Sequence, residues 1–381
     1  MKVLILGGCG HMGSSTAREL IKHDEVSRII LADKKVDMSK VHESVQTSKK
    51  ISSLVLDVAE LETLVKTIKG NDVVINDTAP YSKFGISTVK AAIEAGVSYI
   101  DICDDCRVTK KLFELDEAAK KANVSICTGF GGSPGITNVL AKYGANKLDE
   151  VEEIRVYWGV ALSDPFGSTG RTQALGQFMG NVIQYIDGQW VEVPSGSGSE
   201  EVVFKEPVGK SEVYYALHPE AVTLPRFIPG VNTVIEKGGF IPSWVSKMFM
   251  EFISLGLVSD EALTVDNVSL TARELMSSLV GNASGFWKQV AQYKVSPATV
   301  VVRGKEGGKR VTYTYRFAGR GDTGIAILTS MCALMLYRGD IRTKGVLAPE
   351  GAADPKNFLD ELVKRGAHVM EEKTVEQEVG F

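Results

Sequence analysis

Three glycines close to the start of the chain have the spacing of a dinucleotide-binding turn. Gly8, Gly10 and Gly13 follow the apolar run 3–6, which is typical of a buried strand, and precede a helical pattern. The first glycine allows a tight turn, the second lets a pyrophosphate approach the backbone, and the third lets the helix pack on the strand. The helix N-terminus then offers unpaired N–H groups and a positive dipole to the phosphates. We therefore expect a nicotinamide dinucleotide here, bound by Gly8, Gly10, His11, Met12 and Gly13.

An acidic residue at the end of the second expected strand bears on the choice of cofactor. Asp33 lies 20 positions after Gly13. A carboxylate there accepts hydrogen bonds from the adenosine ribose hydroxyls, which favours NAD over NADP. Lys34 and Lys35 leave NADP as the alternative cofactor, because adjacent cations can bind its 2′-phosphate. Asp57 ends the third expected strand, where it either approaches the adenine or is a solvated loop residue.

The segment after the fourth expected strand, 72–76, contributes to the same crevice. In a parallel sheet of this kind, ligands bind outside the carboxyl ends of the strands. Thr78, Ala79 and Pro80 follow that strand end directly. We therefore expect these three residues to border the nicotinamide ribose.

Candidate acid–base groups follow the ends of neighbouring strands. Tyr81 stands just beyond Pro80, and it either exchanges a proton with a lowered pKa or is a wall residue. Asp104 and Asp105 follow the fifth expected strand. Two adjacent carboxyl groups can divide the charged and protonated roles between them, or bind a substrate ammonium. The alternative is that they cap the helix expected near Thr109.

The second half of the chain offers candidates for holding a substrate. An arginine binds a carboxylate through two parallel hydrogen bonds. His218 is the only histidine in this half besides His368, and it is the imidazole candidate for catalysis. For each of these residues the alternative is a surface or structural role. The expected substrate-binding residues in this half are Arg171, Thr172, Glu220 and Arg226.

Four cysteines need separate consideration. Cys103 and Cys106 form a C-x-x-C pair, and Cys9 and Cys127 stand at other expected strand ends. A zinc site favours two such pairs, and only one is present. A redox disulfide is the other alternative, because low-pKa C-x-x-C thiols are reactive. We expect no metal, and Cys127 is a candidate for lining the substrate pocket.

The spacing of apolar residues indicates the elements that position these groups. Residues 1–130 alternate strand and helix patterns, as in a Rossmann-type doubly wound parallel sheet with helices on both faces. Residues 131–318 contain more polar strands and two helical stretches, 243–255 and 270–293, which predicts an α+β second domain. Residues 319–381 are expected to complete the first domain, with the short strand 367–371 returning to the first sheet. The fold class is therefore α/β with a second α+β domain.

Composition narrows the functional classes. The 381 residues are 44% hydrophobic and 24% charged with a net charge of −4, which is ordinary for a globular protein. No Lys/Arg-rich block indicates a nucleic-acid partner. The longest apolar stretch, 325–337, is shorter than the roughly 20 residues that cross a bilayer. With no signal peptide recognisable, we expect a cytoplasmic protein with a small-molecule substrate.

Several motifs together resemble the saccharopine dehydrogenase family. They are the glycine turn, the segment 72–81, Tyr99-Ile100-Asp101, Gly132-Ser133-Pro134-Gly135 and Gly345–Glu350. His218-Pro219-Glu220, Thr223–Arg226 and the overall length are more similar to its lysine 6-dehydrogenase branch. The resemblance implies hydride transfer between a nicotinamide cofactor and a carbon bearing an amine nitrogen, on an amino acid or opine. It also implies that the second domain covers the nicotinamide crevice and contributes to a homodimer.

The leading hypothesis is therefore an NAD(P)-dependent dehydrogenase acting on the C–N bond of a lysine- or saccharopine-like substrate, or the reverse reduction. A Rossmann reductase of a carbonyl or cyclic imine is the alternative among enzymes. A cofactor-binding regulatory protein without turnover is the alternative of another class.

Overall fold

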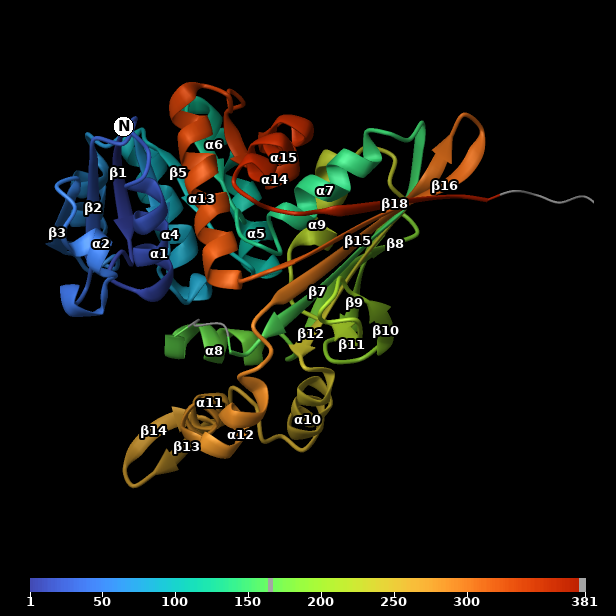
Figure 1. Ribbon diagram of the computed structural model, residues 1–381. Helices are drawn as coiled ribbons and strands as arrows, with labels where there is room; N and C mark the ends of the chain where they lie inside the picture. Colours follow the sequence, from blue (N-terminus) through green and yellow to red (C-terminus); the bar gives the residue numbers. More distant parts are fainter. Residues whose placement is uncertain (164–166, 377–381) are drawn as a thin grey trace, which may run out of the picture. The chain divides into compact units, whose positions relative to one another are not determined.

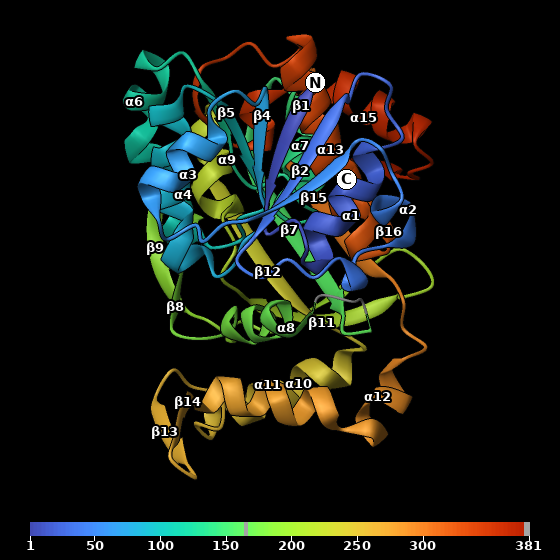
Figure 2. The ribbon, with the colours of Figure 1, turned by 90° about the vertical axis from the view of Figure 1, so that its left-hand side faces the viewer.

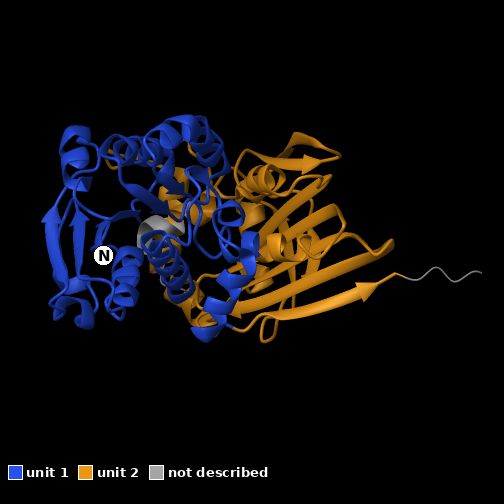
Figure 3. Ribbon diagram, turned by 90° about the horizontal axis from the view of Figure 1, so that it is seen from above, with its two compact units in different colours: residues 1–139, 322–367 blue, residues 140–321, 368–381 orange. Residues whose placement is uncertain are grey.

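The computed structural model describes residues 1–163 and 167–376, with the backbone alone for residues 167–171. The chain divides into two compact units (Figure 3). Unit 1 comprises Met1–Val139 and Asp322–Ala367, and unit 2 comprises Leu140–Gly321 and His368–Phe381. Each unit has its own large sheet.

The sheet of unit 1 is parallel and doubly wound, which confirms the predicted fold class (Figure 1). Its strand order is β17-β6-β5-β4-β1-β2-β3. The chain runs outward from β1 through β2 and β3, and then returns to β4 on the other side of β1. The carboxyl ends of β1 and β4 therefore form the topological switch point, where ligands bind in such sheets. The strands are β1 (Lys2–Leu6), β2 (Arg28–Asp33), β3 (Ile51–Val55), β4 (Val73–Asn76), β5 (Ser98–Asp101), β6 (Ser125–Cys127) and β17 (Gly345–Leu347).

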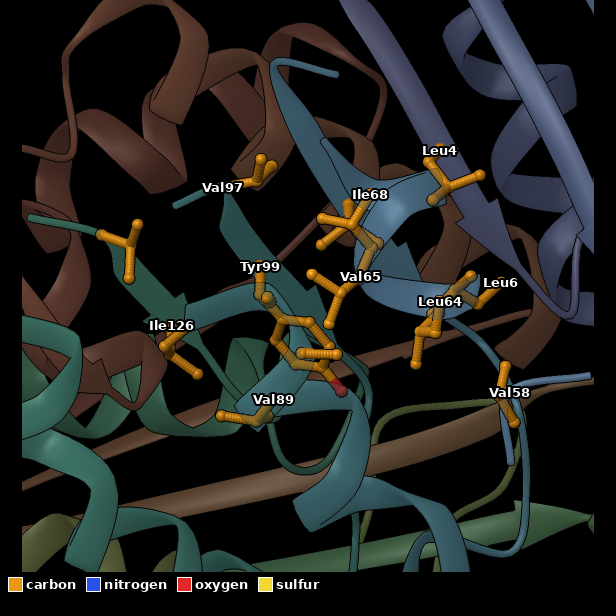
Figure 4. Packing of buried hydrophobic residues seen from close by; sticks show 14 of the residues in the cluster. Leu4, Leu6, Val58, Leu64, Val65, Ile68, Val89, Val97, Tyr99 and Ile126 are labelled. Atoms are coloured by element: carbon orange, nitrogen blue, oxygen red, sulfur yellow. The ribbon is translucent and has the colours of Figure 1, made fainter. Parts of the chain in front are cut away.

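Helices cover both faces of this sheet because its strands are apolar on both sides. Leu4 and Leu6 of β1 join a buried cluster with residues of α3 and α4, shown in Figure 4. Val3 and Ile5 alternate with them, are fully buried and lie outside that cluster, on the opposite face. Figure 2 shows α3 and α4 on one side of the sheet and α1 with α13 on the other. The helices are α1 (His11–Leu20), α2 (Glu43–Gln46), α3 (Leu61–Ile68), α4 (Tyr81–Ala95), α5 (Cys106–Leu112), α6 (Asp116–Lys121), α13 (Gly321–Arg338), α14 (Pro349–Ala352) and α15 (Pro355–Lys364).

Unit 2 is built on a mixed sheet in the order β10-β11-β12-β7-β15-β16-β18, with β8 paired to both β12 and β9. β12 and β7 are parallel, and their neighbours are antiparallel. The strands are β7 (Glu150–Ala161), β8 (Asn181–Ile186), β9 (Gln189–Pro194), β10 (Glu200–Val203), β11 (Lys210–Tyr215), β12 (Thr233–Ile241), β15 (Ser296–Glu306), β16 (Lys309–Gly319) and β18 (Met370–Val375).

The helices of unit 2 include a separate group at one end. α10 (Ser243–Ser254), α11 (Ala272–Asn282) and α12 (Ser284–Val290) lie together with the hairpin of β13 (Ala262–Val265) and β14 (Val268–Thr271), as Figures 1 and 2 show. α8 (Gly167–Gly176) and α9 (Glu220–Phe227) lie nearer the sheet, and α7 (Ile136–Ala145) links the units in sequence. No helix among the described residues is long and apolar enough to cross a membrane.

Two expectations about the chain's later elements are wrong. The terminal strand does not return to the first sheet: β18 pairs with β16 in unit 2. The strand that does return is β17, which pairs in parallel with β6. The expected helix 270–293 is two helices, α11 and α12, separated at Ala283.

Candidate cofactor and substrate sites

The glycine turn between β1 and α1 is packed so closely that side chains are excluded. A Cβ on Gly8 would lie 2.8 Å from the Cα of Leu31, and a Cβ on Gly13 would lie 2.4 Å from the carbonyl oxygen of Gly7. Both obstacles are backbone atoms, which cannot move aside as a flexible side chain would. Gly7 also has a positive φ of 74°, which glycine adopts without strain. These positions therefore require glycine for reasons of local packing.

The N-terminus of α1 fits the pyrophosphate of a dinucleotide. Gly10 is the N-cap, and no side chain caps the helix. The N–H groups of His11, Met12 and Gly13 have no hydrogen-bond acceptor among the described residues. Unpaired N–H groups and the helix dipole both favour an anion. The imidazole of His11 is directed toward α13, where its Nε2 lies 3.6 Å from Oδ2 of Asp322.

The end of β2 carries the acidic residue expected for ribose binding. Asp33 is half-buried, and its Oδ1 accepts a hydrogen bond from the N–H of Lys35 at 3.3 Å. Lys34 and Asp57 pair with each other, with Nζ 2.8 Å from Oδ2. Cys9 lies against this loop: burial raises the pKa of its thiol, while the N–H of Asp37 hydrogen-bonds it. Cys9 thus packs the turn against the segment that follows β2.

The end of β4 is organised by one buried amide. The side-chain oxygen of Asn76 accepts from the N–H of Thr78 at 3.1 Å and from its hydroxyl at 2.5 Å. The side-chain nitrogen donates to Tyr99 Oη at 2.8 Å and Thr88 Oγ1 at 3.1 Å. Ala79 and Pro80 follow Thr78 and are exposed. Asn76 therefore sets the conformation of the segment expected beside the nicotinamide ribose.

Tyr81 lies in the position of a core residue. Only 5% of it is exposed, and its hydroxyl donates to the backbone carbonyl of Asn76 at 2.8 Å. Burial, with added repulsion from Asp101 and Asp77, raises the pKa of the phenol well above its usual range. This arrangement favours the wall role, one of the two alternatives for Tyr81, over proton exchange.

The acidic residues after β5 have different environments. Asp105 is the N-cap of α5: its Oδ1 accepts from the N–H groups of Arg107 at 2.8 Å and Val108 at 3.3 Å. The capping alternative therefore accounts for Asp105, although the helix begins at Cys106, earlier than expected. Asp104 is half-buried in the loop between β5 and α5 and remains a candidate acid–base group.

Two further carboxyl groups at the strand ends were not among the expected site residues. Asp101 is fully buried, and its Oδ1 accepts from the N–H groups of Cys103 and Gly129 and from Thr128 Oγ1, at 2.8 to 3.0 Å. Asp77 follows Asn76 and accepts from Thr16 Oγ1 on α1 at 3.2 Å. Burial, opposed by Thr16 and reinforced by Asp101, raises the pKa of Asp77 to about 7.

The cysteines lie in packed surroundings. Cys103 and Cys106 form no disulfide with the other described residues and are fully buried, and burial raises the pKa of the Cys103 thiol well above its usual range. Such thiols are inert, which does not support a redox function. Cys127 is also fully buried and interacts with the thiol of Cys332 on α13. The described residues include no cluster suited to a metal ion.

Unit 2 contains a buried polar cluster around His218. Nδ1 of His218 lies 3.5 Å from Oε2 of Glu220, and its ring stacks on Trp158 with centroids 4.4 Å apart. The indole N–H of Trp158 donates to Oε1 of Glu236, and the N–H of Glu236 donates to Oε1 of Gln184. Burial raises the pKa of Glu236 to about 8. The nearby His218 acts against this rise, whereas the carboxyl group of Glu220 adds to it. We call these residues the His218 cluster.

The other candidates in unit 2 lie on α8 and α9. Thr172 donates to Ser277 Oγ at 3.0 Å, which ties α8 to α11. Arg226 is exposed in the last turn of α9, whereas Glu220 begins that helix. Arg171 lies in α8, but its side chain is outside the described residues.

Sequence reasoning missed Glu236 and Trp158 for different reasons. β12 was not expected, because Glu236-Lys237-Gly238-Gly239 interrupts its apolar pattern with charges and glycines. Trp158 lies in β7, and an indole side chain in a strand ordinarily belongs to the hydrophobic core. Asp77 directly follows the expected strand 72–76, and this position at a strand end could have identified it as a candidate site residue.

Two family models match nearly the whole chain. The saccharopine dehydrogenase NADP binding domain matches residues 3–127, and the saccharopine dehydrogenase C-terminal domain matches residues 131–367. The chain belongs to the saccharopine dehydrogenase family. It is an NAD(P)-dependent oxidoreductase that acts on CH–NH groups, as predicted.

Members of this family with similar sequences cover the chain from end to end. Carboxynorspermidine synthase of Vibrio cholerae is 26% identical over 405 residues, covering 94% of both chains. Carboxyaminopropylagmatine dehydrogenase of Synechocystis sp. is 22% identical over 394 residues, covering 96% of both. Apo saccharopine dehydrogenase (L-Glu forming) from Saccharomyces cerevisiae shares the fold, with a TM-score of 0.69 at 18% identity over 98% of this chain and 99% of that one.

Proposed function

We propose that this member of the saccharopine dehydrogenase family makes or breaks the secondary amine that joins an amino-acid skeleton to a polyamine-like amine. Two relatives covering the full length carry names of such compounds, carboxynorspermidine and carboxyaminopropylagmatine. Lysine and saccharopine, the substrates first expected, share the same C–N chemistry and are the comparison compounds.

The His218 cluster is the observation that carries this substrate class. Glu220 and Glu236 are both fully buried, Nδ1 of His218 lies 3.5 Å from Oε2 of Glu220, and His218 acts to lower the pKa of Glu236. Two buried carboxyl groups together repel each other, and a cationic partner relieves that repulsion. An ammonium group of a polyamine supplies such a cation, and its binding would lower the pKa of Glu236.

The cofactor is proposed to lie across the switch point of unit 1. The N–H groups of His11, Met12 and Gly13 would hold the pyrophosphate, and Asp33 would accept hydrogen bonds from the adenosine ribose. Thr78, held by Asn76, would border the nicotinamide ribose. The bound nicotinamide supplies the hydride acceptor or donor.

The proton chemistry is proposed for two groups of this chain. Asp104 is the candidate that moves a proton to or from the substrate nitrogen, and His218 is the second candidate. Arg171 and Arg226 are the candidates for holding the substrate carboxylate. We further propose that the protein is a homodimer formed through unit 2, which light scattering on the purified protein would test.

A coupled substrate panel tests the proposal. Purified protein is assayed with NAD and NADP against carboxynorspermidine, saccharopine, lysine and norspermidine, and in reverse with the matching amine and aldehyde acid. We expect the highest kcat/KM with a carboxylated polyamine. Turnover confined to lysine or saccharopine would contradict the polyamine assignment while leaving the C–N chemistry intact.

A pair of variants tests the His218 cluster itself. Glu236→Gln removes a buried carboxyl group at nearly constant volume, and we expect KM for the polyamine to rise about tenfold. Glu201→Gln is the matched control, because Glu201 is exposed and its ion-pair partner among the described residues is Lys210, at 2.7 Å. Equal KM values for both variants and the unmodified enzyme would remove the cluster from substrate binding.

A further inference from the structure

Asp77 stands at the junction of three elements beneath the dinucleotide turn. Its N–H donates to the carbonyl of Leu6 on β1 at 2.9 Å. Its carbonyl oxygen is 2.9 Å from the place that a Cβ on Gly7 would take. Its Oδ2 accepts from Thr16 Oγ1 on α1 at 3.2 Å. The carboxyl group is therefore fixed in place beside the switch point where the cofactor binds.

The surroundings of this carboxyl group contain no compensating cation among the described residues. Oδ1 of Asp77 is buried and has no hydrogen-bond partner there. Asp101 on β5 repels it, and Tyr81 on α4 is a neutral phenol at all ordinary pH values. On α1 the neighbouring group is the uncharged hydroxyl of Thr16. With a pKa of about 7, Asp77 is present in both ionisation states near neutral pH.

We propose that Asp77 is a specificity-determining residue that sets the relative affinity of the enzyme for oxidised and reduced nicotinamide cofactor. The inference rests on the proposed placement of the nicotinamide ribose beside Thr78, the residue that follows Asp77. The oxidised nicotinamide ring carries a positive charge and the reduced ring carries none, whereas the rest of the two molecules is identical. A charged group near the ring therefore discriminates between them through this single difference.

The sign of the effect follows from Coulomb's law. The ionised carboxylate attracts the oxidised ring, so oxidised cofactor binds relatively more tightly above the pKa of Asp77. The neutral carboxyl group removes that preference at lower pH. For unit charges about 12 Å apart at an effective dielectric constant of about 20, the expected change in relative affinity is about tenfold. The pyrophosphate and any 2′-phosphate cancel from the ratio, because both forms of the cofactor carry them.

Cofactor binding without substrate tests this inference. Dissociation constants for the oxidised and reduced forms are measured by calorimetry and nicotinamide fluorescence at intervals of pH across the neutral range. We expect the ratio Kd(reduced)/Kd(oxidised) to rise about tenfold with increasing pH, with its midpoint near the pKa of Asp77. A ratio that stays constant in the unmodified enzyme would overturn the inference, whatever the variants do.

Three variants assign the effect to Asp77. Asp77→Asn should give a ratio independent of pH. Thr16→Val should move the midpoint to higher pH, because it removes the hydrogen bond that favours the carboxylate. Asp72→Asn is the matched control at the opposite end of β4, where its exposed carboxylate accepts from the N–H of Lys2 at 2.6 Å, and it should keep the full pH dependence.

The outcomes separate this inference from the proposed substrate. A pH-dependent ratio in Asp77→Asn equal to that of the unmodified enzyme would overturn the role of Asp77. If Asp77→Asn does not fold, an unmoved midpoint in Thr16→Val would overturn it instead. Failure of every polyamine in the substrate panel leaves these binding measurements unaffected, because no substrate is present in them.

Discussion

The ammonium group of Lys34 lies 2.8 Å from Oδ2 of Asp57, and the two side chains form an ion pair across the carboxyl ends of β2 and β3. The pairing raises the pKa of Lys34 and lowers that of Asp57. A lysine already held by a carboxylate is less available to a cofactor 2′-phosphate. Asp33, one residue earlier, keeps its carboxylate at the end of β2 without a lysine partner among the described ion pairs.

This ion pair makes the cofactor preference testable. Asp33→Ala should lower kcat/KM with NAD by about tenfold, because the ribose hydroxyls lose a charged acceptor. The ratio of kcat/KM with NAD to kcat/KM with NADP should therefore fall. Asp57→Ala is the matched variant: it releases Lys34 and should improve kcat/KM with NADP. An unchanged NAD/NADP ratio in Asp33→Ala would show that Asp33 does not contact the ribose.

The glycine turn should not tolerate even a methyl group. Gly13→Ala places a Cβ 2.4 Å from the carbonyl oxygen of Gly7 and 2.7 Å from the Cα of Gly8. We expect dinucleotide binding to be lost and the melting temperature to fall, measured by calorimetry and by circular dichroism. Gly324→Ala in α13 is the control, since its Cβ would meet nothing within 4 Å. Normal cofactor affinity in Gly13→Ala would mean that the turn is not packed as described.

Tyr81→Phe distinguishes a wall residue from an acid–base group. The variant removes the hydroxyl that donates to the carbonyl of Asn76 at 2.8 Å. We expect the free energy of unfolding to fall by about 1 kcal/mol, with kcat almost unchanged. Urea denaturation and steady-state kinetics measure the two effects separately. A hundredfold fall in kcat at unchanged stability would instead assign proton transfer to the phenol.

Glu236 should make the stability of the protein depend on pH. Its pKa rises from 4.5 in an exposed carboxyl group to about 8 in the folded chain. Between these values the folded chain holds a proton that the unfolded chain has released. The free energy of unfolding should therefore decrease as pH rises through this window and level off above it. Denaturation curves of Glu236→Gln should show a smaller slope, and an identical slope would place the cause in other groups.

Local patterns predicted the parts of the protein that depend on neighbouring residues. The glycine spacing and the end of β2 are set within a few positions of sequence, and the structure places Gly8 and Gly13 in the turn after β1 and Asp33 at the end of β2. Asp105 had a local alternative as well, helix capping, and its hydrogen bonds to Arg107 and Val108 bear that alternative out. Periodicity likewise predicted the parallel sheet, because central strands such as β1 and β4 are apolar and buried on both faces.

Tertiary contacts decided what the sequence pattern left undetermined. The strand 370–375 is largely polar and exposed throughout, so nothing in its composition indicates that it pairs with β16. The charged residues of β12 are buried with partners that are distant in sequence: Trp158 and Gln184 hydrogen-bond Glu236, and Glu200 pairs with Lys237. Tyr81 was an acid–base candidate because it lies just after a strand. The direction of its hydroxyl becomes clear only from the hydrogen bond that it donates to the carbonyl of Asn76.

The pairing of β17 with β6 constrains the order in which the polypeptide can reach its folded form. β6 ends at Cys127, whereas β17 begins at Gly345, so the long segment 128–344 separates two strands that must meet side by side. During synthesis, the whole of residues 140–321 leaves the ribosome before the first sheet can gain its edge strand. The nascent nucleotide-binding unit therefore presents an open sheet edge at β6 until β17 has been synthesised, and such an edge is a template for pairing with another chain.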